Sequence, residues 1–270
     1  MSKFTLAINS HALSDFQECE MKHAFKHFIG IEPLGTKRVM ERGTLFAKFL
    51  EILYKNRLNP RHSFKKVLNN PLIWIPRIVK KCNVSEKEAY DLYATMKEYV
   101  KYWKGRDWEP VAVEKGFSKV IHEDNGNLFV WEGRPDLIAT LNSELLVCDH
   151  KTQGQSKSIY QFNNQARGYL WATGSTKFVY NYIVFTKQVQ FRREVHPFTQ
   201  AQIDDWKSTT IEWFFRLKHA RMNGKFLQSW NCSTIYGPCE FHRICEQPNP
   251  QVQSFTIKSQ FKQRKVYRSW

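Results

Sequence analysis

The fold is decided by residues 131–151, Trp-Glu-Gly-Arg-Pro-Asp-Leu-Ile-Ala-Thr-Leu-Asn-Ser-Glu-Leu-Leu-Val-Cys-Asp-His-Lys. Residues 137–141 and 145–148 are apolar and rich in types that favour strands, whereas the Asn-Ser pair at 142–143 favours a turn. The stretch therefore predicts a β-hairpin.

Charged side chains gather at the end of this hairpin. Successive side chains alternate between the two faces of a strand, so Asp149 and Lys151 share one face and His150 points to the other. Asp136, on the preceding strand, can lie beside Asp149. Two carboxylates suit a hard divalent cation, and a nearby positive charge suits phosphodiester hydrolysis. The competing interpretation is that these are ordinary strand-end or salt-bridge residues, because Asp-x-Lys triplets are common on surfaces.

The composition indicates a globular protein with an anionic partner. The 270 residues are 42% apolar and 15% aromatic, and their formal charge is +16. Such a charge favours nucleic acid first and an acidic membrane surface second, the alternative being a generally basic protein. No apolar run approaches the roughly 20 residues needed to span a bilayer. The apolar stretch at 4–8 is too short for a signal peptide, so we expect a cytoplasmic protein.

The pattern of apolar and turn residues predicts an alternation of helices and strands. A first helix is capped by Asn9 or Ser10, and a capping box at 85–88 opens another that ends near Gly105. Short helical pieces surround Pro71 and Pro76. Further helices are expected at about 20–28, 38–56, 158–173 and 199–224, strands at 111–122, 127–141, 144–150, 177–186 and 189–196, and loops at 30–35 and from 225 onward.

Two further groups of residues stand out. Gln165 and Tyr169 are four residues apart and so project from one helical face, although an ordinary amphipathic helix would show the same spacing; Arg167 is an extra candidate phosphate contact. Glu51, in the stretch 43–51, could face the carboxylates, although a solvated helix carboxylate is the simpler interpretation.

The cysteines indicate a metal or cluster site. Six cysteines in a reducing compartment favour ligation over disulfides. Cys232, Cys239 and Cys245 lie close together in the sequence, and with Cys19 they could provide four thiolates for zinc or an iron–sulfur cluster. The alternative is that these are unrelated free thiols, as we expect for Cys82 and Cys148.

Together these residues resemble the PD-(D/E)xK nuclease superfamily, and within it the RecB-type nucleases that carry a four-cysteine 4Fe–4S cluster, such as CRISPR-adaptation nucleases and AddB nuclease domains. The resemblance covers nearly the whole chain. It puts the family's metal-binding aspartate on Asp136, its acidic-x-lysine motif on Asp149 and Lys151, and its Q-x-x-x-Y motif on Gln165 and Tyr169. The order of these motifs, with one early and three late cysteines, is its specific part.

The resemblance implies a restriction-endonuclease-like α/β fold, in which helices flank a mixed central sheet. It divides the chain into N-terminal helices at 1–56, a helical insertion or lid at 57–105, a nuclease core at 106–224 and a cluster-binding segment at 225–270. The implied cluster ligands are Cys19, Cys232, Cys239 and Cys245, with Zn²⁺ as an alternative to the cluster.

The resemblance also implies a metal-dependent DNA nuclease, expected to be an exonuclease that acts in recombination, repair or DNA processing. Mg²⁺ or Mn²⁺ would bind Asp136, Asp149, the backbone carbonyl of His150 and, in addition, Glu51. Lys151 would assist the reaction. The DNA would be single-stranded or have a free end, a helicase or recombination protein would be a partner, and the setting would be a prokaryotic cell or a phage-infected host. The residues contacting the strand would be Arg134, Lys151, Gln165, Arg167 and Tyr169.

One departure from the family pattern concerns the metal. The family usually has a metal-binding histidine in a Gly-x-x-x-His-x-x-Leu-Glu helix, and here that position is Ala47. A methyl group cannot coordinate a metal, so the site has one ligand fewer, Glu51 compensates, or the activity is altered. This supports an alternative function as a catalytically weakened, DNA-binding or assembly protein. A second alternative is a zinc-stapled basic protein without nuclease ancestry.

Overall fold

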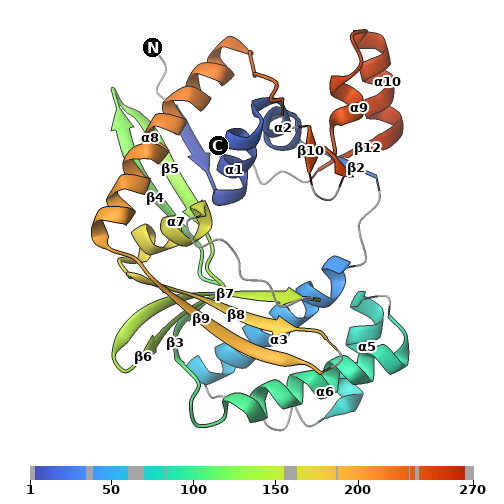
Figure 1. Cartoon of the computed structure of the whole chain (residues 1–270), viewed down its shortest axis with the longest axis vertical. Coiled ribbons are helices and arrows are strands. Elements are labelled where there is room, and N and C mark those ends of the chain that lie inside the picture. The colour runs from blue at the N-terminus through green and yellow to red at the C-terminus, as the bar shows by residue number, and fades with distance from the viewer. Residues whose placement is uncertain are drawn as a thin grey trace. The chain divides into compact units, whose positions relative to one another are not determined.

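The computed structural model describes residues 4–34, 39–59, 70–82, 84–154, 163–186, 188–230, 232–234 and 237–264. The chain forms two compact units, each assembled from separate stretches of sequence (Figure 1). The sheet unit consists of Lys37–Phe117 and Arg134–Ile203, and the terminal unit of Met1–Thr36, Ser118–Gly133 and Asp204–Trp270. The four consecutive segments expected from the sequence remain a prediction, because this division follows packing and not function.

The sheet unit is built on five strands in the order β3-β6-β7-β8-β9. Strands β7 and β8 are parallel, whereas the other neighbouring pairs are antiparallel. Parallel neighbours need a crossover connection, and helix α7 lies between β7 and β8 in the sequence. The bounds are β3 (Glu109–Val113), β6 (Leu137–Leu141), β7 (Glu144–Gln153), α7 (Asn164–Thr173), β8 (Lys177–Val184) and β9 (Gln190–Pro197).

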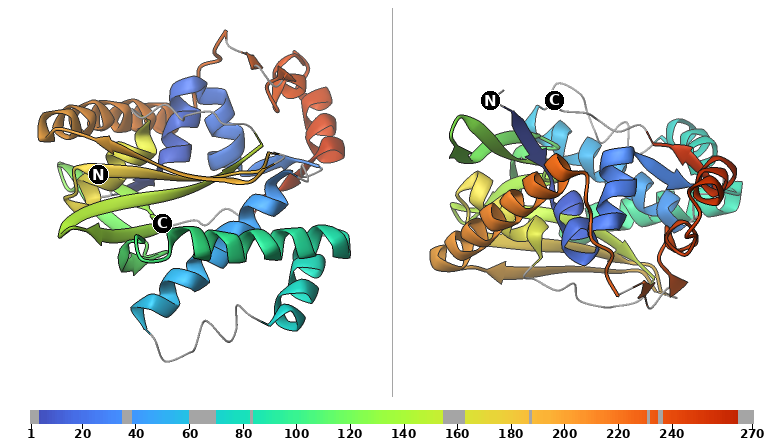
Figure 2. Two further views of the ribbon diagram at one scale, coloured as in Figure 1. Left: turned by 60° about the horizontal axis from the view of Figure 1, so that its bottom comes forward. Right: turned by 90° about the horizontal axis from the view of Figure 1, so that it is seen from above.

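Helices cover the two faces of this sheet. One apolar cluster joins the sheet to α3 (Val39–Leu58), α5 (Pro71–Cys82) and α6 (Glu86–Trp103), which lie below it in Figure 2, left. Cys148 faces this cluster. Its neighbour Val147 faces the second cluster, which contains Ala166 and Leu170 of α7. The alternation along β7 thus gives α3 one face of the strand and α7 the other.

The terminal unit combines the first and last parts of the chain with a central hairpin. Strand β1 (Thr5–Ile8) pairs in parallel with β5 (Asn127–Gly133), which also pairs with β4 (Phe117–Asp124). Phe129 of β5 stacks on Phe214 with ring centroids 5.1 Å apart. The helices of this part are α1 (Ser10–Glu18), α2 (Glu20–His23), the π-helix η1 (Ala24–Ile29) and α8 (Gln200–Asn223), whose first residues belong to the sheet unit.

The C-terminal segment packs against the N-terminal one. Phe241 stacks on Phe25 and on Phe261, with ring centroids 5.4 and 5.7 Å apart. Strand β12 (Phe261–Gln263) pairs with β2 (Ile31–Pro33). The remaining elements are β10 (Ser233–Thr234), β11 (Gly237–Pro238), α9 (His242–Cys245) and α10 (Pro250–Gln260). No helix in the described parts of the chain is long and apolar enough to cross a bilayer.

Several sequence predictions are confirmed by local geometry. The Asn9 side chain accepts the Ala12 N–H, and the Ser85 capping box is complete. Gly174 ends α7 with a φ of 74°. The hairpin turn has positive φ at both Asn142 and Ser143, as a two-residue hairpin loop requires. The expected class, a mixed sheet flanked by helices, is also confirmed.

Two predicted strands are each broken in the structure. The expected strand at 111–122 ends at Val113 and restarts at Phe117, because Glu114 has a φ of 51° and leaves the ladder. The expected strand at 127–141 is interrupted after Gly133, since Pro135 has no N–H to donate to a neighbouring strand. These breaks separate the β4–β5 hairpin, which belongs to the terminal unit, from the five-stranded sheet.

Other predictions were wrong because tertiary contacts outweigh local preference. The segments at 30–35 and after 225, expected as loops, contain β2 and β12, which pair with each other, and the helices α9 and α10. The two expected pieces around Pro71 and Pro76 are the single helix α5. The 20–28 helix changes to π geometry at Ala24, and the strand β1 was not expected. The start of the predicted 158–173 helix lies outside the described residues.

Candidate active site and cysteine pocket

Three carboxylates follow one another across neighbouring strands of the sheet unit. Val113 of β3 pairs with Leu137 of β6, and Leu137 pairs with Cys148 of β7. Glu114, Asp136 and Asp149 are the next residues at this level of the sheet. The Glu114 N–H donates to the Asp136 carbonyl oxygen at 3.1 Å. The strand register therefore brings the two predicted aspartates to one place, and it adds a glutamate that the sequence interpretation missed.

Asp149 is surrounded by the predicted lysine and glutamine. Its side chain is almost fully buried, and its Oδ2 lies 2.6 Å from Lys151 Nζ. Gln165 Nε2, on α7, donates to Asp149 Oδ1 at 2.9 Å. These contacts place both groups on the α7 face of β7. An ammonium and an amide thus hold one carboxylate from two directions.

Asp136 is held by the backbone of β7. The peptide N–H of His150 donates to Asp136 Oδ2 at 2.7 Å. Burial raises the pKa of Asp136; for Asp149, burial and then the nearby Asp136 charge raise the pKa against the opposing effect of Lys151. Two adjacent buried carboxylates are unfavourable when both are ionised, and a bound cation would relieve that cost. Their donor set therefore fits Mg²⁺ or Mn²⁺.

The glutamate missed by the sequence interpretation shares this environment. Burial and then the charge of Asp136 raise the pKa of Glu114, and Arg134 Nε lies 3.0 Å from Glu114 Oε2. Tyr169 OH donates to the Arg134 carbonyl oxygen at 3.2 Å, which links α7 to this group. The sequence did contain a signal for this residue, because the run Glu114-Lys115-Gly116 includes a glycine that favours a turn. A turn there would have ended the strand that was predicted to continue to residue 122.

Two predicted residues have other surroundings. Glu51 pairs with Lys48 and Lys55, each at 2.7 Å. Burial acts to raise the pKa of Glu51, but these two lysines outweigh it and lower the pKa. Arg167 comes two residues after Gln165, and helix geometry therefore directs it to another side of α7. The contacts around Asp149 thus come from Lys151 and Gln165.

The helix that carries Ala47 lies directly against β7. A Cβ added to Gly43 would lie 2.6 Å from Thr152 Oγ1, so a side chain at position 43 would clash with the strand. Ala47 is one turn further along the same side of α3 and is half-buried. His150 faces this side of β7, where its ring stacks on Tyr54. Burial lowers the pKa of His150 to about 4, so its imidazole is neutral at pH 7.

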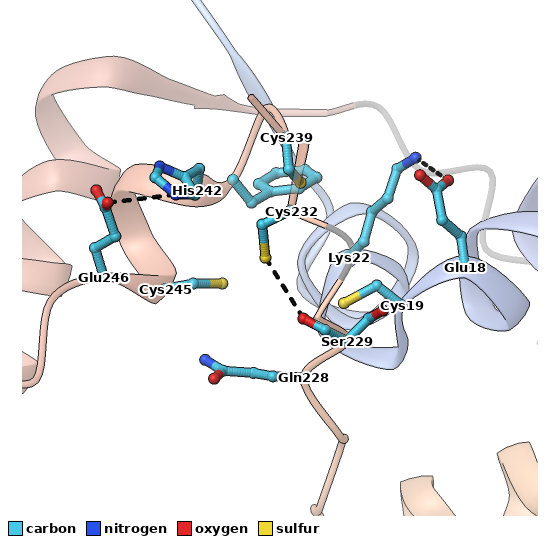
Figure 3. Close-up of a pocket in the computed structure, with 11 residues that line it drawn as sticks. Glu18, Cys19, Lys22, Gln228, Ser229, Cys232, Cys239, His242, Cys245 and Glu246 are labelled. Carbon is cyan, nitrogen blue, oxygen red and sulfur yellow. Dashed lines mark hydrogen bonds and ion pairs between the residues drawn. The ribbon is translucent and has the colours of Figure 1, made fainter. Parts of the chain in front are cut away.

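The four predicted cluster cysteines line one cavity of the terminal unit. Its volume is about 150 Å³, and Cys19, Cys232, Cys239 and Cys245 all contribute to its wall (Figure 3). Cys19 lies at the junction of α1 and α2, whereas the other three come from the last part of the chain. The sulfurs of Cys19, Cys232 and Cys245 point toward one another in Figure 3. The thiols are therefore brought together from segments more than 200 residues apart.

Charge repulsion affects this pocket as it affects the carboxylates. Burial, and then the charges of the other three cysteines, raise the pKa of Cys245 to about 11, and burial raises the pKa of Cys239. Across the described residues, no three His, Cys, Asp or Glu side chains are grouped closely enough to hold a metal ion. Cys148 is buried elsewhere, in the sheet unit. The side chain of Cys82 is outside the described set.

A mixed sheet with helices on both faces, with neighbouring carboxylates and a lysine on its strands and a glutamine on the adjoining helix α7, is typical of a nuclease-like class of protein. The model of the PD-(D/E)XK nuclease superfamily matches residues 8–246. The chain belongs to this superfamily and has its restriction-endonuclease-like fold.

Solved structures with low sequence identity are also similar to the chain. The structure of SSO0001 is 15% identical, with 91% of this chain and 87% of that chain covered and a TM-score of 0.37. A candidate exonuclease from Eubacterium rectale is 14% identical, with 92% of each chain covered and a TM-score of 0.46. Among curated proteins, none matches the chain.

Proposed function

We propose that the chain is a Mg²⁺- or Mn²⁺-dependent deoxyribonuclease, and that it acts on DNA with a free end or in single-stranded form. The observation that carries this is the group around Asp149, where Lys151 lies at 2.6 Å and Gln165 donates at 2.9 Å beside a second buried carboxylate. The formal charge of +16 supports a nucleic-acid partner. A helicase or recombination protein as partner, and a role in DNA repair or recombination, are the finer part of the proposal.

The proposed roles follow from position. Asp136 and Asp149 would hold the cation, with the His150 carbonyl and Glu114 as further oxygen ligands. The bound cation would supply an activated water and charge stabilisation on the phosphate. Lys151 would keep its ammonium beside the attacked phosphate, where negative charge develops. Gln165 orients Asp149, and Tyr169 holds the Arg134 backbone. The exposed Arg134 guanidinium pairs with Glu114 through Nε, and its other nitrogens would contact a DNA phosphate.

The activity is tested by incubating the purified chain with linear and circular DNA, each single- and double-stranded, with Mn²⁺ and with EDTA. We expect Mn²⁺-dependent loss of linear DNA and survival of the circles, because an exonuclease needs an end. Cleavage of circular DNA would assign endonuclease action. No cleavage of any substrate, with DNA binding unchanged by EDTA, would support the alternative of an inactive DNA-binding protein.

That alternative rests on Ala47, and adding the missing ligand tests it. We expect Ala47→His to lower the Mn²⁺ concentration needed for half-maximal cleavage by about tenfold, because an imidazole supplies one further metal ligand. Titration of Mn²⁺ against initial cleavage rate checks this, with Ala47→Gln as the control of similar size. Equal metal dependence in all three proteins would show that position 47 does not contribute to the site.

A stability measurement tests the metal site without any DNA. At pH 7 and without metal, Asp136→Asn is expected to be more stable than the wild type by roughly 1 kcal/mol, or about 2–4 °C in Tm. The reason is that the folded state raises the pKa of Asp136, so ionisation of this carboxyl costs stability above that pKa.

The sign of this effect depends on pH and on metal. The advantage of Asp136→Asn should shrink as the pH falls through the raised pKa of folded Asp136, because protonation removes the unfavourable buried charge. Added Mn²⁺ should reverse the order, since only the wild type keeps both carboxylates. Thermal denaturation at several pH values, with and without Mn²⁺, gives both comparisons. A variant that is less stable than the wild type in every condition would contradict the proposed site.

We also propose that Cys19, Cys232, Cys239 and Cys245 hold a 4Fe–4S cluster. What supports this is that the four thiols line one cavity, whereas no three of the described His, Cys, Asp or Glu side chains are grouped closely enough to hold a single metal ion. A single Zn²⁺ needs four sulfurs at about 2.3 Å from one centre, whereas in a four-iron cluster each thiolate binds a different iron and the sulfurs lie further apart. The cluster would carry no electrons for hydrolysis. Its role would be to join the first and last segments of the terminal unit.

A further inference from the structure

A chain of buried polar groups lies behind β7, on the face opposite Asp149 and Lys151. The His150 ring stacks on Tyr54, with centroids 5.8 Å apart and planes 9° from parallel. Asn181 of β8 places its Nδ2 2.9 Å from His150 Nδ1 and donates to Tyr99 OH at 2.9 Å. Tyr99 OH in turn lies 3.2 Å from Tyr54 OH, which closes a ring of contacts around His150. Tyr54, Tyr99 and Asn181 are fully buried.

At its far end, this network reaches the ion pairs that Asp107 forms with two arginines. Tyr54 OH donates to Asp107 Oδ1 at 3.2 Å, and Asp107 pairs with both Arg57 and Arg193. The Arg193 guanidinium lies between two indole rings, 3.6 Å from the centroid of Trp103 and 3.5 Å from that of Trp108. Arginine held on both faces and at its edge has little freedom to move. The far end of the network is therefore fixed.

Such a network is costly if its only purpose is to fill the core. Burying hydroxyls, an amide and an ion pair costs free energy that apolar side chains of the same size would not cost. Directional contacts instead fix orientation, because each hydrogen bond weakens steeply when its angle changes. The network is therefore better suited to orienting a neighbouring group than to filling space.

The peptide that joins Asp149 to His150 is the group that needs this orientation. The N–H of this peptide donates to Asp136 Oδ2 at 2.7 Å. The carbonyl carbon of the same peptide is bonded to the Cα atom that carries the Asp149 side chain. One peptide plane therefore determines how the two carboxylates face each other. The His150 side chain projects from the next Cα atom to the opposite face of β7. There it contacts Asn181 and Tyr54 of the polar network.

We propose that the network of Tyr54, Tyr99, Asn181, Asp107 and Arg193 acts through His150 to position Asp136 and Asp149 for the divalent cation. The inference rests on the proposed nuclease function and adds a set of positioning residues to it. His150 contributes through its imidazole, from the side of the sheet away from the DNA, in addition to the expected contribution of its backbone carbonyl. Loss of such supporting hydrogen bonds typically weakens metal binding by about 10- to 100-fold.

The test compares His150→Phe and Tyr99→Phe with Ile183→Val. His150→Phe keeps a ring to stack on Tyr54 but removes the acceptor for Asn181, and Tyr99→Phe removes one hydroxyl. Ile183→Val shortens a fully buried side chain of the same apolar cluster and leaves the polar contacts in place, so it controls for lost stability. Mn²⁺ affinity is measured without DNA, by calorimetry or by the paramagnetic signal of free Mn²⁺.

We expect each of the two network variants to bind Mn²⁺ about tenfold more weakly than the wild type, and Ile183→Val to bind it as the wild type does. Cleavage should then recover at high Mn²⁺. Unchanged Mn²⁺ affinity in a folded Tyr99→Phe and a folded His150→Phe would overturn the inference while leaving the metal site itself intact. A wild type that binds no Mn²⁺ would overturn both, so the two failures can be told apart. If His150→Phe does not fold, Tyr99→Phe alone decides.

Discussion

Replacing Lys151 with methionine is expected to lower the rate of DNA cleavage by about 10²- to 10³-fold, the usual effect of removing one charged group that stabilises a transition state. The Lys151 ammonium lies 2.6 Å from Asp149 and is partly exposed, so it can contact both the carboxylate proposed to bind the metal and a phosphate. Methionine has nearly the same length but carries no charge. Single-turnover cleavage of end-labelled DNA at saturating Mn²⁺ measures the effect on the chemical step.

Lys177→Met is the matched control for this experiment. Lys177 lies in the same sheet and pairs with Glu144, so it has the same type of ion pair at the opposite end of β7. Its replacement should leave the cleavage rate within a factor of about two, because an exposed ion pair contributes at most about 1 kcal/mol. If Lys151→Met cleaves DNA as fast as Lys177→Met, Lys151 has no role in the reaction.

Cys245→Ser is expected to remove iron and acid-labile sulfide from the purified protein and to lower its stability by about 5 kcal/mol. This figure is the loop-closure contribution of linking residues 19 and 232 alone, by the relation used for a disulfide. The wild type, purified without oxygen, should contain close to four irons and four sulfides per chain. Elemental analysis, visible absorbance and chemical denaturation of both proteins provide the comparison.

Cys148→Ala controls for the loss of a thiol elsewhere. Cys148 is fully buried in the sheet unit, away from the cysteine cavity, so its replacement should leave the iron content unchanged. One zinc per chain without visible absorbance would show that the four cysteines bind a structural zinc ion and not an iron–sulfur cluster. Full stability of Cys245→Ser together with no metal of any kind in the wild type would show that these four thiols hold no cofactor.

The sequence predicted the centre of the sheet unit well because its signals are local. The turn at Asn142, the cap at Ser85 and the alternation that separates His150 from its two neighbours each depend on a few adjacent residues. The predicted hairpin also placed Asp136 beside Asp149, and the resemblance to a family added their expected role in binding a metal ion. Once β6 and β7 form a hairpin, their register brings these two residues together.

Features that depend on distant partners escaped prediction. Strand β2 forms because β12, more than 200 residues later, pairs with it, and no pattern near Ile31 indicates that partner. Glu114 was assigned to the interior of a strand, so its place beside Asp136 was not expected. Glu51 was a reasonable ligand from its spacing, but Lys48 and Lys55 form a local ion-pair group around it.

The discontinuous make-up of the two units has a consequence for synthesis on the ribosome. All residues of the sheet unit have been made by the time the chain reaches Ile203. In the terminal unit, β1 can pair only after β5 has been made. Cys19 can join the other cysteines of the cavity only after the C-terminal segment has been made. A nascent chain released at Ile203 would contain every residue of the sheet unit but an incomplete terminal unit. We therefore expect the terminal unit to be the last part of the chain to fold.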